Sequence, residues 1–144
     1  MRSSRSYART CLPVVAVAVA LLLPGCSKDS DPTAVACRTV RQVDGVTKVT
    51  IVGKNVQFDV KCLNIDPGQL ELTFDNQDSG VAHNLHITGN GVNEKTELEP
   101  GKTTQELNVS LTMPGQYTFA CDPHGSMAGK IIVADPTTTE TTTS

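Results

Sequence analysis

The stretch "GQYTFACDPHGSM", from Gly115 to Met127, combines a strand pattern with a cluster of soft metal donors. Tyr117, Phe119 and Cys121 recur at every second position. Successive residues of a strand point to opposite faces, so these three side chains should share one buried face. The cysteine is therefore expected to emerge from the core at the end of a strand.

The residues that follow the cysteine favour a tight turn, because they include Pro123 and Gly125. Such a turn can bring His124 and Met127 around the same point as the Cys121 sulfur. The sequence thus gathers a thiol, an imidazole and a thioether at one strand end, and a fourth donor must come from elsewhere in the chain.

The same alternation, or a run of β-branched residues, recurs along the chain, at 46–52, 57–60, 68–76, 81–87, 104–111 and 129–133. Turn signals such as Asp-Pro-Gly, Glu-Pro-Gly and Met-Pro-Gly separate these segments. No convincing helical period is present. The pattern predicts an all-β domain, a Greek-key β-sandwich or barrel, in which residues 90–99 form a loop.

Only two other histidines, His83 and His86, can supply the missing donor. Strand alternation places His83 on the inward face with Leu85, and His86 on the opposite face with Asn84. His83 is therefore the predicted distant ligand. His86 is expected to be exposed, and it would replace His83 if the strand contained a bulge.

His83, Cys121, His124 and Met127 together predict a site for one copper ion that alternates between Cu(I) and Cu(II). Two imidazoles and a thiolate suit a trigonal copper plane, with the thioether as a weak axial ligand. Zinc fits less well, because structural zinc sites do not usually recruit methionine. A dinuclear copper centre would need a second cysteine in the loop, and a calcium site would need regularly spaced carboxylates.

Over roughly residues 50–133 the sequence resembles the blue-copper cupredoxins of the plastocyanin and amicyanin type. The resemblance rests on "HN" at 83–84, on "YTFACDPHGSM" at 117–127 and on the following "GKIIV". The C-x2-H-x2-M spacing is closer to amicyanin than to plastocyanin.

The resemblance implies a cupredoxin fold and a one-electron carrier rather than an enzyme. It assigns His83, Cys121 and His124 as equatorial ligands and Met127 as the axial one. It also implies that Asn84 bonds across to the loop that bears the cysteine, and that redox partners dock near His124.

Three other functions compete with electron transfer, of which a metal-free adhesion or interaction domain would leave Cys121 unexplained. Copper storage, delivery or resistance could use the same ligands, but such proteins usually need an open site with clustered methionines or histidines, and this chain has three methionines and no such cluster. Multicopper oxidases and nitrite reductases need further copper sites, and only His86 is spare. No Ser-His-Asp order or paired-carboxylate site stands out.

The N-terminus predicts export. Residues 1–25 combine three arginines with a short apolar run, which is typical of a signal peptide, and "LPGC" at 23–26 resembles a bacterial lipobox. Cys26 would then carry lipid and anchor the protein to the outer face of the cell membrane. The alternative is an ordinary secretory signal in which Cys26 has no special role.

The remaining chain divides into a lipidated Cys26 with a flexible tether (26–36), a cupredoxin domain (37–134) and a Thr-rich disordered tail (135–144). Loss of residues 1–25 removes three of 12 basic residues and none of 15 acidic ones, which leaves a net charge of about −6. This charge argues against a nucleic-acid partner.

The cysteines of the exported domain are expected to include one disulfide. In an oxidising compartment Cys37 and Cys62 can pair, although two separate buried thiols are the alternative. Pairing leaves Cys121 as an odd thiol, for which a metal is a good explanation.

Overall fold

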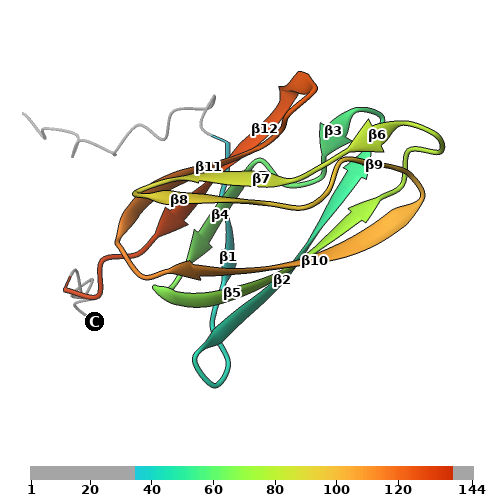
Figure 1. The fold of residues 1–144 in the computed structure, drawn as a ribbon. Helices are drawn as coiled ribbons and strands as arrows, with labels where there is room; N and C mark the ends of the chain where they lie inside the picture. The colour runs from blue at the N-terminus through green and yellow to red at the C-terminus, as the bar shows by residue number, and fades with distance from the viewer. Residues whose placement is uncertain (1–34, 138–144) are drawn as a thin grey trace, which may run out of the picture. The chain divides into compact units, whose positions relative to one another are not determined.

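The computed structural model describes residues 35–137. The regular secondary structure of this part of the chain consists of β-strands, and it contains no helix (Figure 1). One sheet has six strands, in the order β1 (Arg38–Val40), β4 (Cys62–Ile65), β12 (His124–Val133), β11 (Gly115–Cys121), β7 (His86–Gly89) and β8 (Val92–Lys95). A second sheet has the order β10 (Thr103–Leu111), β5 (Gly68–Asn76), β2 (Val46–Lys54) and β3 (Gln57–Phe58). The short strands β6 (Ala82–His83) and β9 (Glu99–Pro100) form a separate antiparallel pair.

The predicted all-β Greek-key sandwich is confirmed. Strands that are neighbours in the sheets are often distant in the chain, as in the parallel pairs β2–β5, β1–β4 and β4–β12. The remaining pairs are antiparallel, and the β5–β10 and β11–β12 ladders are the long ones. The two sheets enclose a common core (Figure 1).

Three phenylalanines form the centre of this core. Phe58 lies edge-on to Phe74, with ring centroids 5.9 Å apart, and 5.4 Å from Phe119. All three are buried, and each comes from a different strand. Such rings contribute large buried apolar areas, so they fix the spacing of β3, β5 and β11 beneath the predicted site.

The predicted strand pattern omitted β1 and β4 and was wrong in two further details. Residues 90–99, expected to form a loop, contain β8 and the first residue of β9. β8 lies at a sheet edge and is largely exposed, so its sequence lacks the alternation that marks a half-buried strand. The expected strand 81–87 is interrupted between β6 and β7, where Asn84 and Leu85 are both buried and period-two alternation fails.

A disulfide joins Cys37, just before β1, to Cys62 at the start of β4. The bond closes a loop with a sequence separation of 25 and ties the N-terminal strand to the six-stranded sheet. Cys121, in contrast, is a free and buried thiol. This is the arrangement expected from the sequence.

Several predictions concern residues outside the described range: the signal peptide (1–25), Cys26 with most of its tether, and the end of the Thr-rich tail (138–144). Within residues 35–137, no helix long and apolar enough to cross a membrane is found.

Gly129 should be required for the packing of the core. It faces Phe119 across the β11–β12 ladder, and a methyl group at Gly129 would overlap the phenylalanine ring. Gly129→Ala should therefore lower the free energy of unfolding by about 2 kcal/mol, measured by urea denaturation.

Gly125→Ala is the matched control, because a methyl group there meets no atom within 4 Å. Adding Phe119→Leu to Gly129→Ala should recover part of the loss. A Gly129→Ala protein within about 0.5 kcal/mol of wild type would contradict this explanation.

Candidate metal centre

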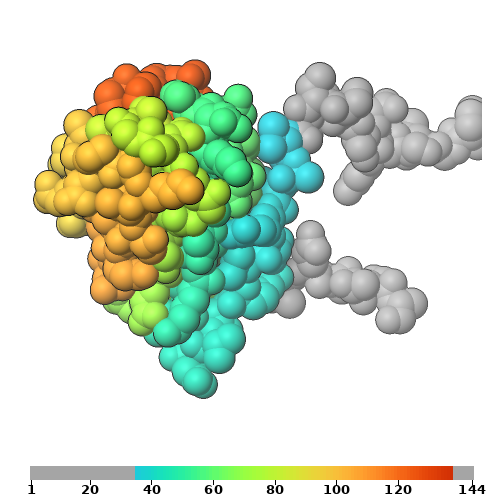
Figure 2. All heavy atoms as spheres, turned by 90° about the vertical axis from the view of Figure 1, so that its right-hand side faces the viewer, coloured from blue at the N-terminus to red at the C-terminus, as the bar shows by residue number. Residues whose placement is uncertain are grey.

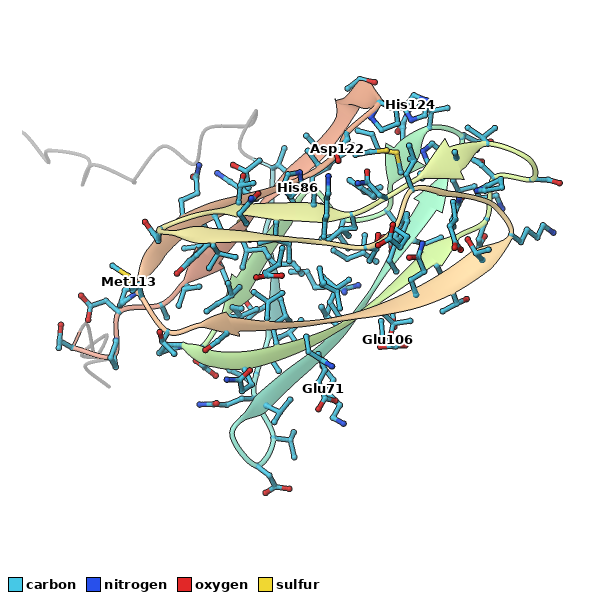
Figure 3. All side chains as sticks on the ribbon, viewed as in Figure 1. Glu71, His86, Glu106, Met113, Asp122 and His124 are labelled. Carbon is cyan, nitrogen blue, oxygen red and sulfur yellow. A yellow bond between two sulfur atoms is a disulfide. The ribbon has the colours of Figure 1, made fainter. Side chains whose placement is uncertain are left out.

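The candidate site lies where β11 runs into β12 and where β6 ends (Figure 3). Cys121 is the last residue of β11, His124 is the first of β12, and the two face each other across the ladder. The register shifts between Ala120 and Cys121, so the ladder is irregular where the donors begin. His83, the last residue of β6, reaches the same point from a distant part of the chain.

Three predicted ligands converge on one point. The Nδ1 atoms of His83 and His124 are 3.0 Å apart, and each lies 3.5 Å from the sulfur of Cys121. Metal bonds of about 2.0 Å to imidazole nitrogen and about 2.3 Å to thiolate sulfur put ligand atoms roughly 3 to 4 Å apart. The donor set therefore has the spacing and the chemistry that a single copper ion requires.

Met127, the predicted axial ligand, is fully buried on β12, three residues after His124. Its methyl group packs close to Gly53 of β2, where an added Cβ would lie in tight contact with Met127 and Phe74. The thioether is thus enclosed in the core beside the strand end that bears His124. Its role as a fourth ligand stays a prediction.

Burial sets the protonation of the cysteine. It raises the pKa of the Cys121 thiol, and the charge of Asp122 adds to the rise, while hydrogen bonds from the backbone N–H groups of Asn84 and His124 oppose it. A buried thiolate is disfavoured unless a positive charge lies beside it. A metal cation bound between the three donors would supply that charge, so the site fits a metal electrostatically as well.

Asn84 braces the loop that bears the cysteine, in the way that the resemblance implied. Its side-chain amide donates to the Asp122 carboxylate at 2.8 Å and its oxygen accepts the Asp122 backbone N–H at 2.9 Å. These two bonds connect the residue after His83 to the residue after Cys121. They hold the two halves of the donor set together.

His86 is not part of the donor set. Its Nδ1 lies 2.7 Å from Asp122 Oδ1 and its Nε2 lies 2.7 Å from Asn93 Oδ1. The carboxylate of Asp122 also accepts a hydrogen bond from Lys95 at 3.0 Å. With an oxygen at each nitrogen, His86 can donate to both partners only in its imidazolium form. The hydrogen bond from His86, followed by those from Asn84 and Lys95, strongly lowers the pKa of Asp122.

Sequence reasoning missed two carboxylates at the site, Asp78 and Asp122. Asp122 was detectable in principle, because it follows Cys121 directly. Asp78 has no such signal. It precedes His83 by five residues, and its contact with that histidine depends on how the chain turns between β5 and β6.

Comparisons with known proteins agree with the metal site described above. A family model for a cupredoxin-like domain matches residues 14–133. Amicyanin-alpha of Methylorubrum extorquens is 30% identical over 120 residues, which cover 82% of this chain and 98% of that protein.

Two solved structures share the fold. Rusticyanin from Thiobacillus ferrooxidans has a TM-score of 0.57 and 20% identity, over 70% of this chain and 85% of the other. Auracyanin A, a "blue" copper protein from Chloroflexus aurantiacus, has a TM-score of 0.55 and 18% identity, over 62% and 100% of the two chains.

The His86 network predicts a pH-dependent contribution to stability. The hydrogen bond to Asn93, followed by that to Asp122, raises the pKa of His86. The resulting stabilisation is fully present below the unfolded-state pKa of about 6.5 and is lost as the pH rises through the higher folded-state pKa. His86→Gln should therefore destabilise the metal-free protein more at about pH 5.5 than at about pH 9.

Urea denaturation of both proteins at the two pH values measures this difference. Asn93→Ala, which removes one acceptor, should show the same trend with a smaller amplitude. Equal destabilisation by His86→Gln at both pH values would show that the imidazolium contributes nothing.

Proposed function

This chain belongs to the cupredoxin family, and from that membership we propose that it is a mononuclear blue-copper electron carrier. The observation that carries the proposal is the convergence of His83, Cys121 and His124, whose donor atoms lie within 3.5 Å of one another. His83, Cys121 and His124 would hold the ion, with Met127 as the weak fourth ligand. When bound, copper supplies one-electron chemistry between Cu(I) and Cu(II).

The residues around the donor set also meet two further requirements of an electron carrier, namely shielding of the site from water and a rigid arrangement of the ligands. His83, Cys121 and Met127 are buried, so these side chains are shielded from water. Cys121 and His124 are held by the β11–β12 ladder, and Asn84 ties the segment of His83 to them. A donor set fixed in this way needs little movement when the charge at its centre changes.

The exposed rim of the site is the proposed docking surface for a redox protein. His124 is half-buried, and the residues on either side of it (122, 123, 125 and 126) are exposed. Figure 3 labels Asp122 and His124 at this end of the molecule. A partner that covers these residues comes closest to the donor atoms, because His83 and Cys121 lie beneath them.

A single site favours a carrier over an enzyme. Among residues 35–137, the donor set is the only group of three or more His, Cys, Asp or Glu residues that could hold a metal. The third histidine of the chain, His86, is engaged by Asp122 and Asn93. Burial of the ligands also favours a retained ion over the exchangeable one that copper storage or delivery requires.

We further propose that the mature protein is anchored by lipid at Cys26 on the outer face of the cell membrane. Support comes from the "LPGC" sequence after a short apolar run and from the Cys37–Cys62 disulfide, which suits an oxidising compartment. In this proposal residues 1–25 are removed, residues 26–36 act as a tether, and the Thr-rich tail beyond residue 134 stays unstructured.

Addition of Cu(II) to the purified domain should produce an intense visible thiolate-to-copper band and a reversible redox couple. Cys121→Ser and His83→Gln should each lose most of this absorption, because each removes one of the three close donors. His86→Gln is the matched control and should keep the colour, since its imidazole lies outside the donor set.

A wild-type domain that stays colourless, or a Cys121→Ser protein that keeps the colour, would refute the copper assignment. Rapid loss of copper to a chelator would instead favour storage or delivery.

Lipid anchoring can be tested with the full-length chain in a bacterial host. Cys26→Ser should move most of the protein from the membrane fraction to the soluble exported fraction, whereas Cys11→Ser should leave it on the membrane. If the wild type is already soluble, or if Cys26→Ser stays on the membrane, the anchor proposal fails.

A further inference from the structure

Asp78 lies behind the buried histidine of the site. Its Oδ2 atom is 2.9 Å from Nε2 of His83, on the side of the ring away from the other donors. The His83 side chain is fully buried and the Asp78 side chain is only 12% exposed. The contact is therefore a largely dehydrated hydrogen bond between a carboxylate and an imidazole, which is stronger than a neutral bond in water.

Asp78 is itself held by the hairpin turn between β2 and β3. Its carboxylate accepts the backbone N–H groups of Asn55 at 2.6 Å and Val56 at 2.8 Å. Both turn residues have left-handed backbone angles, with φ of 53° and 56°, so two successive N–H groups point to one carboxylate. Figure 2 shows the green segments around the β2–β3 turn and the β5–β6 connection beside the red-orange β11–β12 end.

These bonds have two consequences for Asp78. The N–H groups of Val56 and Asn55 stabilise the ionised form and help to lower the pKa of the carboxyl. They also fix its position, together with the bond that its backbone N–H donates to Asn76 Oδ1 at 3.1 Å. The carboxylate cannot turn away from His83 without losing its other partners.

A carboxylate that accepts a hydrogen bond at Nε2 places the ring proton there. The lone pair of His83 is then on Nδ1, the atom that faces Cys121 and His124. His124 differs, because within residues 35–137 no side chain or backbone group forms a hydrogen bond with its Nε2. The two imidazoles of the donor set are thus inequivalent.

We propose that Asp78 is a positioning residue that fixes the Nε2–H tautomer of His83 and, through its negative charge, favours the oxidised state of the bound copper. The inference rests on the proposed function, since it assumes that copper occupies the donor set. The oxidised site carries one more positive charge than the reduced one, so the attraction of a nearby carboxylate is larger for the oxidised site. The same hydrogen bond makes Nδ1 a stronger donor.

Asp78→Asn is the test variant, because it keeps the shape of the side chain and removes the charge. We expect the equilibrium constant for reduction to increase roughly tenfold, a shift of the reduction potential of about 59 mV to more positive values. Cyclic voltammetry of the copper-loaded domains measures the potential. Asp78→Glu, which keeps the charge, should lie closer to wild type than Asp78→Asn does.

Asp59→Asn is the matched control. The Asp59 carboxylate also accepts a backbone N–H near the same hairpin, from Val52 at 2.7 Å. It forms no hydrogen bond with either histidine of the donor set. If such carboxylates acted only by stabilising the fold, Asp78→Asn and Asp59→Asn would change the reduction potential to a similar extent. Our proposal requires that Asp59→Asn keep the wild-type potential.

A second readout needs no metal. In the metal-free wild type, imidazole ¹⁵N NMR should show His83 with a protonated Nε2 and an unprotonated Nδ1, and Asp78→Asn should reduce this preference. His83 protonated on Nδ1 in the wild type overturns the proposal, even if Asp78→Asn fails to fold.

The outcomes separate this inference from the proposed function. If the wild type binds no copper or shows no redox couple, the carrier function fails. If the wild type is a redox-active copper protein and Asp78→Asn has the same potential as wild type and Asp59→Asn, only the role of Asp78 fails.

Discussion

The paired hydrogen bonds between Asn84 and Asp122 are the constraint on which the donor set depends. They join residues 38 positions apart, one next to His83 and the other next to Cys121. The ladder between β11 and β12 sets the distance from Cys121 to His124, but nothing in that ladder places His83. Each bond contributes on the order of 1 kcal/mol, and the bond that ends on the Asp122 carboxylate is the stronger of the two. Their larger effect is directional, because the amide is engaged as donor and acceptor and cannot rotate.

Charge around the site is arranged in two layers. Asp122 lies toward the surface, where His86 and Lys95 offset its charge. Asp78 is only 12% exposed, and its carboxylate is held by the backbone N–H groups of the β2–β3 turn and by His83 rather than by a lysine or arginine. The carboxylate with the smaller compensation is thus the one that touches the buried histidine. The two imidazoles of the donor set therefore differ in their electrostatic surroundings.

Alternation in the sequence predicted the long strands because each has one buried face, as in β5 and β11. It also predicted that His83 and Cys121 face the core, and both are buried although the strand pattern breaks down beside each of them. It missed β1 and β4, which are short and pair in parallel. It could not predict Asp78, because that contact depends on a turn 22 residues away and on backbone angles that no periodicity encodes. Local patterns therefore identified the donors, while the groups that orient them required the tertiary fold.

The two histidines of the donor set differ in ways that follow from where their strands end. His83 ends β6 inside the protein, so its second nitrogen must find a protein partner, and Asp78 provides one. His124 begins β12 at the rim, where water can satisfy its second nitrogen, so no such partner is required. In the proposed carrier this asymmetry separates two tasks. The buried imidazole can be tuned by a charge that no docking partner reaches, and the rim imidazole can meet a partner without a fixed carboxylate beside its outer nitrogen.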